Sequence, residues 1–396
     1  MVMKQTEIGL IPEDWEVKEL GELGEVKMCK RVFQNQTSEI GEIPFYKIGT
    51  FGKEPDAYIS RIHFEDFKNR FSYPKVGEIL ISAAGTIGRT VVYNGEESYF
   101  QDSNIVWIAN KEEIVSNALL KYILEEIKYN TEGGTIQRLY NNILKSTKFI
   151  CPPLAEQEAI ANALSDADAW IEKLEQLIAK KRLIKQGAMQ TLLTPKDGWE
   201  EVDFNKVVWF QEGPGLRNWQ FTKSGIKVIN VTNLENGYLN LSKTSRHISI
   251  EEYERMYKHF LIDEGDVVVA SSGNSYGKVA IVRSQDLPLL MNTSVIRFKP
   301  LNGITYLYML VFLKSNLFKD QIDLLITGGA QPNFGPAHLN KLKIAMPKSL
   351  SEQERIATIL SDMDTEIEGL EQQLGKARHI KQGMMQELLT GRIRLV

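Results

Sequence analysis

A glycine-containing run in the second half of the chain has the residue types of a phosphate-binding loop. The run SSGNSYGKV, residues 271–279, places Gly273, Gly277 and Lys278 after an apolar stretch. A nucleotide-binding P-loop needs four residues between its glycines and a Ser or Thr after its lysine, which hold phosphates and Mg²⁺. Here the glycines are one residue too close and Val279 follows the lysine. The spacing therefore predicts a turn between two strands.

Other catalytic and metal-binding signatures are also missing from the sequence. No GxGxxG motif follows an apolar strand-like run, and no Asn-Pro-Pro or Asp-Pro-Pro motif of an amino-methyltransferase is present. Cys29 and Cys151 are the only cysteines, and their separation excludes a CxxC metal site, so we expect buried, reduced thiols. No two histidines are spaced i, i+4, as a metal site on a helix would need. They are scattered along the chain at His63, His247, His259, His338 and His379. The sequence therefore gives no sign of a catalytic or metal-binding motif.

Length and composition are those of an ordinary globular protein. The 396 residues predict two or three domains, with 43% hydrophobic and 25% charged residues. No apolar run reaches 18 residues and the first residues lack a signal-peptide core, so we expect a cytoplasmic protein without a membrane span. The net charge of −4 argues against nonspecific, charge-driven binding of nucleic acid, but it allows a binder that gathers its cations on one face.

One segment occurs twice. Residues 154–194 align without a gap on residues 350–390, and 26 of 41 positions are identical. In both copies apolar residues recur at steps of four and three, the a/d pattern along which two helices pack. The predicted seam consists of Ile160, Leu164, Ala167, Ile171, Leu174 and Ile178 in the first copy and Ile356, Leu360, Met363, Ile367, Leu370 and Leu374 in the second. Two matched stripes favour pairing of the helices with each other.

Fainter repeats lie outside the helices, and they define the domain order. VGEILISAAGTIGRTVVY (76–93) resembles EGDVVVASSGNSYGKVAIV (264–282). Each intervening stretch has short β-rich runs, such as Glu78–Ser82 and Asp266–Ser271, and one helical stretch, roughly Ser116–Tyr129 or Ile304–Phe318. This pattern predicts mixed α/β domains. A compact domain has its ends close together, so the second helix should start near the end of the first and run antiparallel to it over about 50 Å. The expected boundaries are 1–150 (domain), 151–194 (helix), 195–348 (domain) and 349–396 (helix).

Three motifs carry a resemblance to a known family. IGLIPEDWEVKELGEL (8–23), PPLAEQEAIANALSDADAWIEKLE (152–175) and the closing LLTGRIRLV (388–396) resemble type I restriction–modification specificity (S) subunits, in the family's order along the whole chain. The resemblance implies a noncatalytic subunit with two target recognition domains, each reading one half of a bipartite, asymmetric target on double-stranded DNA. It also implies that two antiparallel coiled-coil helices set the spacing and dock two methylation (M) subunits, which use S-adenosylmethionine, and that restriction (R) motor-nuclease subunits join them. No cofactor is expected in this subunit.

Given this resemblance, polar side chains on turns between predicted strands are the candidates for base and phosphate contacts. The first domain offers Lys47, Lys53, Arg61, Arg70, Thr86, Arg89, Gln137, Arg138, Tyr140 and Asn141. The second offers Arg217, Asn230, Asn233, Arg246, Asn274, Tyr276, Lys278, Gln331 and Asn333. Trp170, Glu172, Glu366 and Glu368 are expected on outer helix faces, where partner subunits would dock. The alternative is a coiled-coil adaptor whose domains bind proteins, which the acidic net charge would suit.

Overall fold

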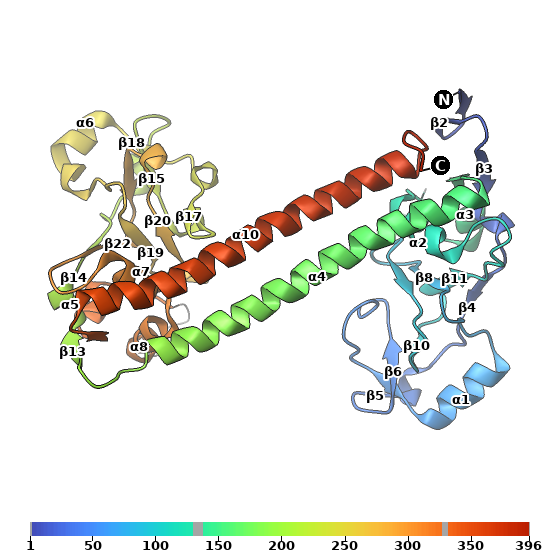
Figure 1. Cartoon of the computed structure of the whole chain (residues 1–396), viewed down its shortest axis with the longest axis horizontal. Coiled ribbons are helices and arrows are strands. Elements are labelled where there is room, and N and C mark those ends of the chain that lie inside the picture. Colours follow the sequence, from blue (N-terminus) through green and yellow to red (C-terminus); the bar gives the residue numbers. More distant parts are fainter. Residues whose placement is uncertain (1, 130–137, 327–331, 396) are drawn as a thin grey trace. The chain divides into compact units, whose positions relative to one another are not determined.

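The computed structural model describes residues 2–129, 138–326 and 332–395, and they divide into two compact units (Figure 1). Unit 1 comprises Met1–Glu175 and Gln372–Val396, and unit 2 comprises Gln176–Glu371. Two 39-residue helices, α4 (Leu154–Leu192) and α10 (Leu350–Leu388), each contribute one part to unit 1 and one part to unit 2. Each unit therefore combines a mixed α/β domain with segments of both helices.

Ion pairs within each unit establish the direction of the two helices. In unit 1, Arg378 Nη2 lies 2.6 Å from Glu175 Oε1, and Lys381 Nζ lies 2.6 Å from Asp168 Oδ1. Moving forward along α10 thus means moving backward along α4. Unit 2 shows the same order, since Lys181 pairs with Glu366 and the later Lys185 pairs with the earlier Asp364. The antiparallel pairing expected from the sequence is confirmed in both units.

Unit 1 is built around an antiparallel sheet in the order β4-β11-β8-β9, with a second sheet in the order β10-β6-β7-β5 and two two-stranded ladders, β1-β2 and β12-β3. Its strands are β1 (Met3–Thr6), β2 (Gly9–Pro12), β3 (Glu16–Glu19), β4 (Val26–Met28), β5 (Thr37–Ser38), β6 (Ile43–Tyr46), β7 (Tyr58–Ile59), β8 (Ile79–Ser82), β9 (Thr90–Val92), β10 (Tyr99–Phe100), β11 (Ile105–Ile108) and β12 (Lys148–Cys151). Its helices besides the long ones are η1 (Leu20–Glu22), η2 (Gln34–Gln36), α1 (Arg61–Arg70), α2 (Asn117–Glu126) and α3 (Asn141–Ser146).

The central strands of unit 1 are apolar on both faces because two cores meet at the sheet. Ile79 and Ile81 of β8 face a core shared with α2, α3 and the long helices, whereas Leu80 faces a core shared with the second sheet. Successive side chains of a strand point to opposite faces, so both cores draw on the same four residues. The sheet therefore lies between two packed cores, which hold its strands and the loops at their ends in place.

Unit 2 repeats this plan with sheets in the orders β14-β22-β19-β20 and β18-β15-β21 and with ladders β13-β23 and β16-β17. Its strands are β13 (Trp199–Asp203), β14 (Val208–Glu212), β15 (Ile226–Ile229), β16 (Leu234–Glu235), β17 (Tyr238–Leu239), β18 (His247–Ile248), β19 (Val267–Ala270), β20 (Val279–Ile281), β21 (Leu289–Met291), β22 (Val295–Pro300) and β23 (Lys343–Pro347). Its shorter helices are α5 (Phe204–Val207), η3 (Asn218–Gln220), η4 (Val231–Asn233), η5 (Leu241–Lys243), α6 (Ile250–Glu252), η6 (Tyr253–Tyr257), η7 (Lys258–Phe260), η8 (Gly273–Ser275), η9 (Ser284–Asp286), α7 (Tyr306–Lys314), α8 (Asn316–Leu325) and α9 (Pro336–Leu339).

Seam residues near the two helix starts belong to the domain cores. Ile160 and Leu164 are fully buried in the core of unit 1 beside Met385, and Ile356 and Leu360 occupy the matching places in unit 2. Of the remaining seam residues, Ala167, Leu174, Ile178 and Ile367 are buried, and Ile171, Met363, Leu370 and Leu374 are half-buried. The apolar stripe thus fastens each helix start to its own domain as well as lining the helix.

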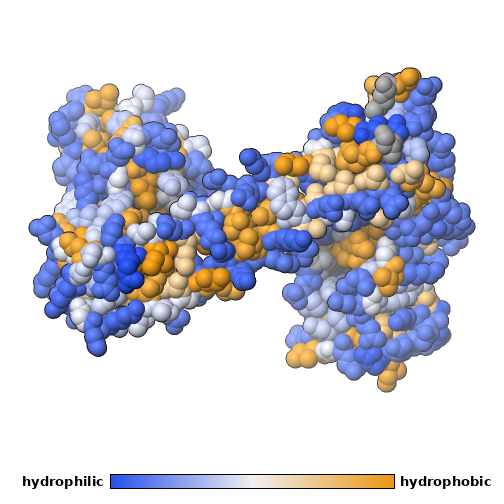
Figure 2. Space-filling model, in the orientation of Figure 1, coloured by the Kyte–Doolittle hydropathy of each residue, from blue (hydrophilic) through white to orange (hydrophobic). Residues whose placement is uncertain are grey.

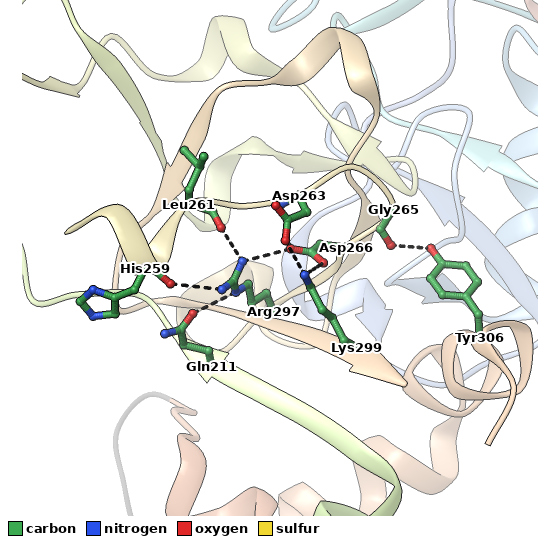
Figure 3. Close-up of polar contacts among 9 residues, drawn as sticks. All are labelled: Gln211, His259, Leu261, Asp263, Gly265, Asp266, Arg297, Lys299 and Tyr306. Carbon is green, nitrogen blue, oxygen red and sulfur yellow. Dashed lines mark hydrogen bonds and ion pairs between the residues drawn. The ribbon is translucent and has the colours of Figure 1, made fainter. Parts of the chain in front are cut away.

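A buried arginine ties an irregular segment of unit 2 to its sheet (Figure 3). Arg297 on β22 donates from Nε to Gln211 Oε1 at 2.9 Å, from Nη2 to the His259 carbonyl at 3.3 Å, and from Nη1 to the Leu261 carbonyl. Its Nη1 also lies 3.3 Å from Asp266 Oδ2, and the two side chains are 7% and 2% exposed. The guanidinium therefore supplies hydrogen-bond donors to carbonyls at the end of η7, which have no partner within that short helix.

Charged clusters fasten the long helices to the unit 1 domain. Asp168 of α4 accepts hydrogen bonds from Lys121 Nζ at 2.9 Å and Tyr122 OH at 2.8 Å, in addition to its pair with α10. At the end of the chain, Arg394 donates from Nε to the buried Glu156 Oε1 at 2.6 Å. Arg394 also donates through both terminal nitrogens to Asp14, at 3.0 and 2.9 Å. The last residues are thereby held against the first part of unit 1.

Candidate functional site

In unit 1 a polar hairpin and a second polar turn lie side by side at one end of the central sheet. The hairpin joins β8 to β9 and carries Thr86 and Arg89. Backbone pairing between Ala84 and Arg138, and a 2.9 Å bond from the Leu139 amide to the Ala83 carbonyl, dock the second turn onto it. The second turn also presents Tyr140 and Asn141, both exposed. These two adjacent turns carry five of the candidates, although about fifty residues separate the turns in sequence.

The hairpin of unit 1 is held in place by a close approach. Gly88 has φ +82°, and the Tyr129 ring lies 2.9 Å from where a β-carbon would stand. A side chain at this position would be strained and would collide with the ring. Arg89 donates from Nη1 to the Phe51 carbonyl at 2.8 Å, which brings the loop with the exposed Lys53 against the hairpin. The turn expected at the glycine-containing repeat is thus confirmed, with a defined conformation.

Unit 2 builds the same arrangement from different residues. Ser272 pairs with Asn333, and the Phe334 amide donates to the Ser271 carbonyl at 3.0 Å, as their counterparts do in unit 1. Asn333 and Lys278 are exposed beside this junction. Tyr276 is half-buried and donates from its hydroxyl to Asp323 Oδ1 at 2.7 Å. Burial and this hydrogen bond raise the Tyr276 pKa, so its hydroxyl remains a neutral donor.

Two candidates, Asn230 and Asn233, follow β15 in the second sheet of unit 2 and differ in how deeply they are buried. Asn233 is fully buried, accepts from the Asn230 amide at 2.8 Å and donates to the Asn240 carbonyl at 2.9 Å. Its side chain has no polar atom free for DNA, so Asn233 supports its loop and leaves the candidate set. Asn230 is half-buried and accepts from the Thr232 amide and hydroxyl. This loop contacts η8, which keeps Asn230 near the hairpin of unit 2.

Other candidates lie apart from the two junctions, the places where Arg138 pairs with Ala84 and Asn333 pairs with Ser272. Arg61, at the start of α1, pairs with Glu97 at 3.0 Å, and Arg70, at its end, pairs with Asp66 at 3.0 Å. Lys47 is half-buried, with its Nζ 2.9 Å from Asp56. Arg217 and Arg246 are exposed in unit 2. Gln137, Gln331 and the side chain of Asn274 lie outside the described residues.

Chemically, both junctions are sets of hydrogen-bond donors and acceptors. Arginine and asparagine side chains on rigid turns can form paired hydrogen bonds with base edges, and lysines can neutralise phosphates. Within the described residues no group of His, Cys, Asp or Glu is arranged to hold a metal ion. Burial raises the pKa of Cys29 to about 12 and that of Cys151 to about 11, so both are inert thiols, as the sequence predicted.

Over residues 2–129, 138–326 and 332–395, no helix is both long and apolar enough to cross a membrane. On the face shown in Figure 2, hydrophilic residues cover most of each unit. Two exposed aromatic residues, Phe33 and Trp219, depart from this pattern, with 59% and 81% of their surface accessible. Sequence reasoning missed both, because a single aromatic residue in a loop carries no periodic signal.

Comparison with known proteins identifies one family. Residues 12–181 and 196–376 each match the family model of the type I restriction modification DNA specificity domain. The chain is 59% identical over 155 residues to a chain named as a type I restriction enzyme specificity subunit in Haemophilus influenzae, which covers 39% of this chain and 40% of that relative. It is 26% identical over 411 residues to the MjaVIII specificity subunit of Methanocaldococcus jannaschii, which covers 97% of this chain and 94% of that relative.

Solved structures share the fold over nearly the whole length. The S subunit of a type I restriction–modification system from M. genitalium superposes with a TM-score of 0.62 at 18% identity, covering 98% of this chain and 99% of that chain. A chain from a structure on complex assembly and conformational transition of the type I system gives 0.57 at 13% identity, covering 97% and 99%. At these identities the likeness supports the fold, and the predicted fold class is confirmed.

Proposed function

Because the chain belongs to the type I restriction modification DNA specificity domain family, we propose that each of its two units reads one half of a split, asymmetric DNA target. The observation that carries this proposal is the twofold construction. Both units dock a polar turn onto the β-hairpin of the central sheet through the same backbone pairing, yet Arg138 stands in one junction and Asn333 in the other. Two similar scaffolds with different side chains would read two different half-sites.

We infer further that this subunit has no catalytic role. Its described residues hold no metal cluster, its two cysteines are buried, and no nucleotide-binding motif occurs in the sequence. Methylation would belong to partner methylation subunits that carry S-adenosylmethionine, and cleavage to restriction subunits. The contribution of this chain is then differential binding, in which the correct bases satisfy buried or oriented polar groups and incorrect ones leave them unpaired.

Two methylation subunits would dock along α4 and α10, because the repeated helix sequences, identical at 26 of 41 positions, offer a similar surface twice. Trp170 of α4, which is 45% exposed, is a candidate for contact with one of the two subunits, and its counterpart in α10 is Glu366. On α10, Glu366 pairs with Lys181 at 2.6 Å, and the exposed Glu368 lies two residues further along the helix. Replacing Trp170 with Ala should weaken co-purification with the methylation subunit while the chain's own unfolding transition stays in place. Full recovery of the complex would remove Trp170 from the docking surface.

The experiment that tests the main proposal is methylome sequencing of the host with and without this gene. The expected result is loss of one bipartite adenine mark, whose two halves give both targets at once. A methylome that does not change would refute the proposal, provided that the methylation subunit is expressed. A sharper version replaces Asn333 with Ala, alone and together with Gln331→Ala. These variants should change the bases accepted in one half and leave the other half intact, whereas equal change in both halves would contradict unit-by-unit reading.

A further inference from the structure

Each unit contains a second, smaller turn at an equivalent place in its fold. In unit 1 the turn η2 begins after β4 ends at Met28, and Ser38 then pairs with Tyr58. In unit 2 the turn η3 begins after β14 ends at Glu212, and Thr222 pairs with His247. Ten positions separate the strand end from the pairing residue in both cases. The two turns are therefore structural equivalents without insertion or deletion.

The same glutamine holds both turns in the same conformation. The Phe33 amide donates to Gln36 Oε1 at 2.9 Å, and the Arg217 amide donates to Gln220 Oε1 at 2.7 Å. The residues before the turns have φ, ψ of −88°, 157° and −97°, 154°. Gln220 is buried and also donates to Tyr257 OH at 2.9 Å, which fastens the unit 2 turn to η6. Such side-chain caps fix a short backbone segment that has no other regular structure.

The exposed residues of the two turns differ at every position. Unit 1 presents Phe33, Gln34 and Asn35, whereas the matching positions 217–219 of unit 2 carry Arg, Asn and Trp, and all six side chains are exposed. An exposed Trp is costly to leave in water and is typical of a contact surface. A conserved support with divergent exposed residues is the arrangement expected of a reading element.

Candidates for DNA contact lie beside each turn. In unit 1 a surface hollow of about 620 Å³ is lined by Phe33, Gln34 and Lys47 among others. In unit 2 the Arg246 guanidinium lies 4.9 Å from the centre of the Phe221 ring, next to the end of the turn. Arginine stacked on an aromatic ring keeps its donors in one plane and available for a base edge. Each turn thus lies beside a cation that the sequence analysis proposed as a candidate for DNA contact.

We propose that these two turns, residues 33–35 and 217–219, are specificity-determining elements that contact bases, each in the half-site of its own unit. The proposal rests on the proposed DNA-reading function. Gln34, Asn35 and Asn218 can each form paired hydrogen bonds with adenine, and Arg217 can do so with guanine. The ring of Trp219 offers an apolar surface to a thymine methyl group or a stacked base.

A docking site for a protein partner is the rival explanation of the exposed aromatic residues. Two copies of one methylation subunit would need the same surface in both units, as the repeated helices provide. The turns do the reverse, because their exposed residues change while the glutamine that caps each turn is kept. Different exposed residues on the two turns are expected if each turn contacts a different DNA half-site. They are not expected if both turns contact copies of the same protein.

The test exchanges the exposed residues between the turns and keeps Gln36 and Gln220 in place. One variant carries Phe33→Arg, Gln34→Asn and Asn35→Trp, and the second carries the reverse changes at 217–219. Each is assembled with the methylation subunit and used to methylate a library of split targets, which is then sequenced. We expect altered base preference in one half only, about 5- to 150-fold at the affected positions, the discrimination of one good paired contact. Asn218→Ala, a milder change, should relax preference at one position.

The controls separate this inference from the proposed function. Ile250→Ala removes an exposed apolar side chain from the same unit, 62% accessible, and should leave base preference unchanged. If the wild-type complex writes no bipartite mark, the proposed function fails. If it writes the mark and both exchanged variants write the same mark, the turns do not read bases and the inference is overturned. Loss of the methylation subunit from either exchanged variant would also overturn it, in favour of a protein contact.

Discussion

Replacement of Arg297 by Ala tests how the irregular part of unit 2 is held to its sheet. The change removes donors to Gln211 and to the carbonyls of His259 and Leu261, and it removes one partner of the buried Asp266. Breaking a buried ion pair from one side costs about 3–5 kcal/mol, because the remaining charge is left without compensation. Asp266 keeps Lys299 at 3.3 Å, so we expect the lower end, about 3 kcal/mol.

The free energy of unfolding is measured by urea titration of the purified chain, followed by circular dichroism, with hydrogen exchange reporting on residues 253–262. Since the pair is buried, the loss should persist in about 1 M salt, where the Debye length is about 3 Å. A double variant, Arg297→Met with Asp266→Asn, should recover part of the loss because it leaves no unpaired charge. Lys343→Ala is the control, because its pair with Glu201 is exposed and contributes at most about 1 kcal/mol.

A loss below about 1 kcal/mol for Arg297→Ala, or a loss that disappears in salt, would show that the cluster behaves as a surface pair. Protection of residues 253–262 should fall in parallel with the free energy of unfolding. Since Gln220 donates to Tyr257 in this segment, the base preference tied to the unit 2 turn should also broaden. Unchanged exchange in this segment would contradict the reasoning even if the global stability fell.

Three further changes have defined outcomes. Burial opposes ionisation of Asp168, but hydrogen bonds from its lysine and tyrosine neighbours lower its pKa overall. Its contribution to stability is therefore present above about pH 4 and declines as pH falls through the lowered pKa. Asp168→Asn should reduce urea resistance more at pH 7 than at pH 3, and an equal loss at both would contradict this reasoning. Arg394→Ala removes a charged partner of the buried Glu156 and should destabilise unit 1 by about 2 kcal/mol in the same titration. Gly88→Ala should distort the unit 1 hairpin against Tyr129 and relax base preference in one half-site only, and unchanged methylation would show that the hairpin does not read DNA.

Strong periodicity in the sequence was enough to predict the main elements. The long helices follow from apolar steps of four and three, and the strand expected at 266–271 appears as β19, Val267–Ala270. The helix expected at 304–318 is instead two helices, α7 and α8. Ser315 ends the first and caps the second, with its hydroxyl accepting from the Phe318 amide. The apolar pattern runs through this break, so periodicity alone could not reveal it.

The candidate site was predictable only in part. Residue type and glycine-containing turns pointed to Arg138 and Asn333, but strand pairing was needed to place each beside its hairpin. Asn233 was assigned to DNA by its type, and only burial shows that its amide serves the loop. The exposed turn with Trp219 became visible only after the strands of the two units were matched, because its equivalence lies in backbone register and not in sequence similarity.

The interrupted make-up of unit 1 has a consequence for synthesis on the ribosome. Unit 2 is one continuous stretch, whereas the core of unit 1 also contains Met385 and Leu388, which are translated last. Domains generally fold as they emerge. We therefore expect a released chain truncated after residue 371 to have a protease-resistant unit 2 and protease-sensitive residues 1–175, so that the first part translated is the last to reach its native state.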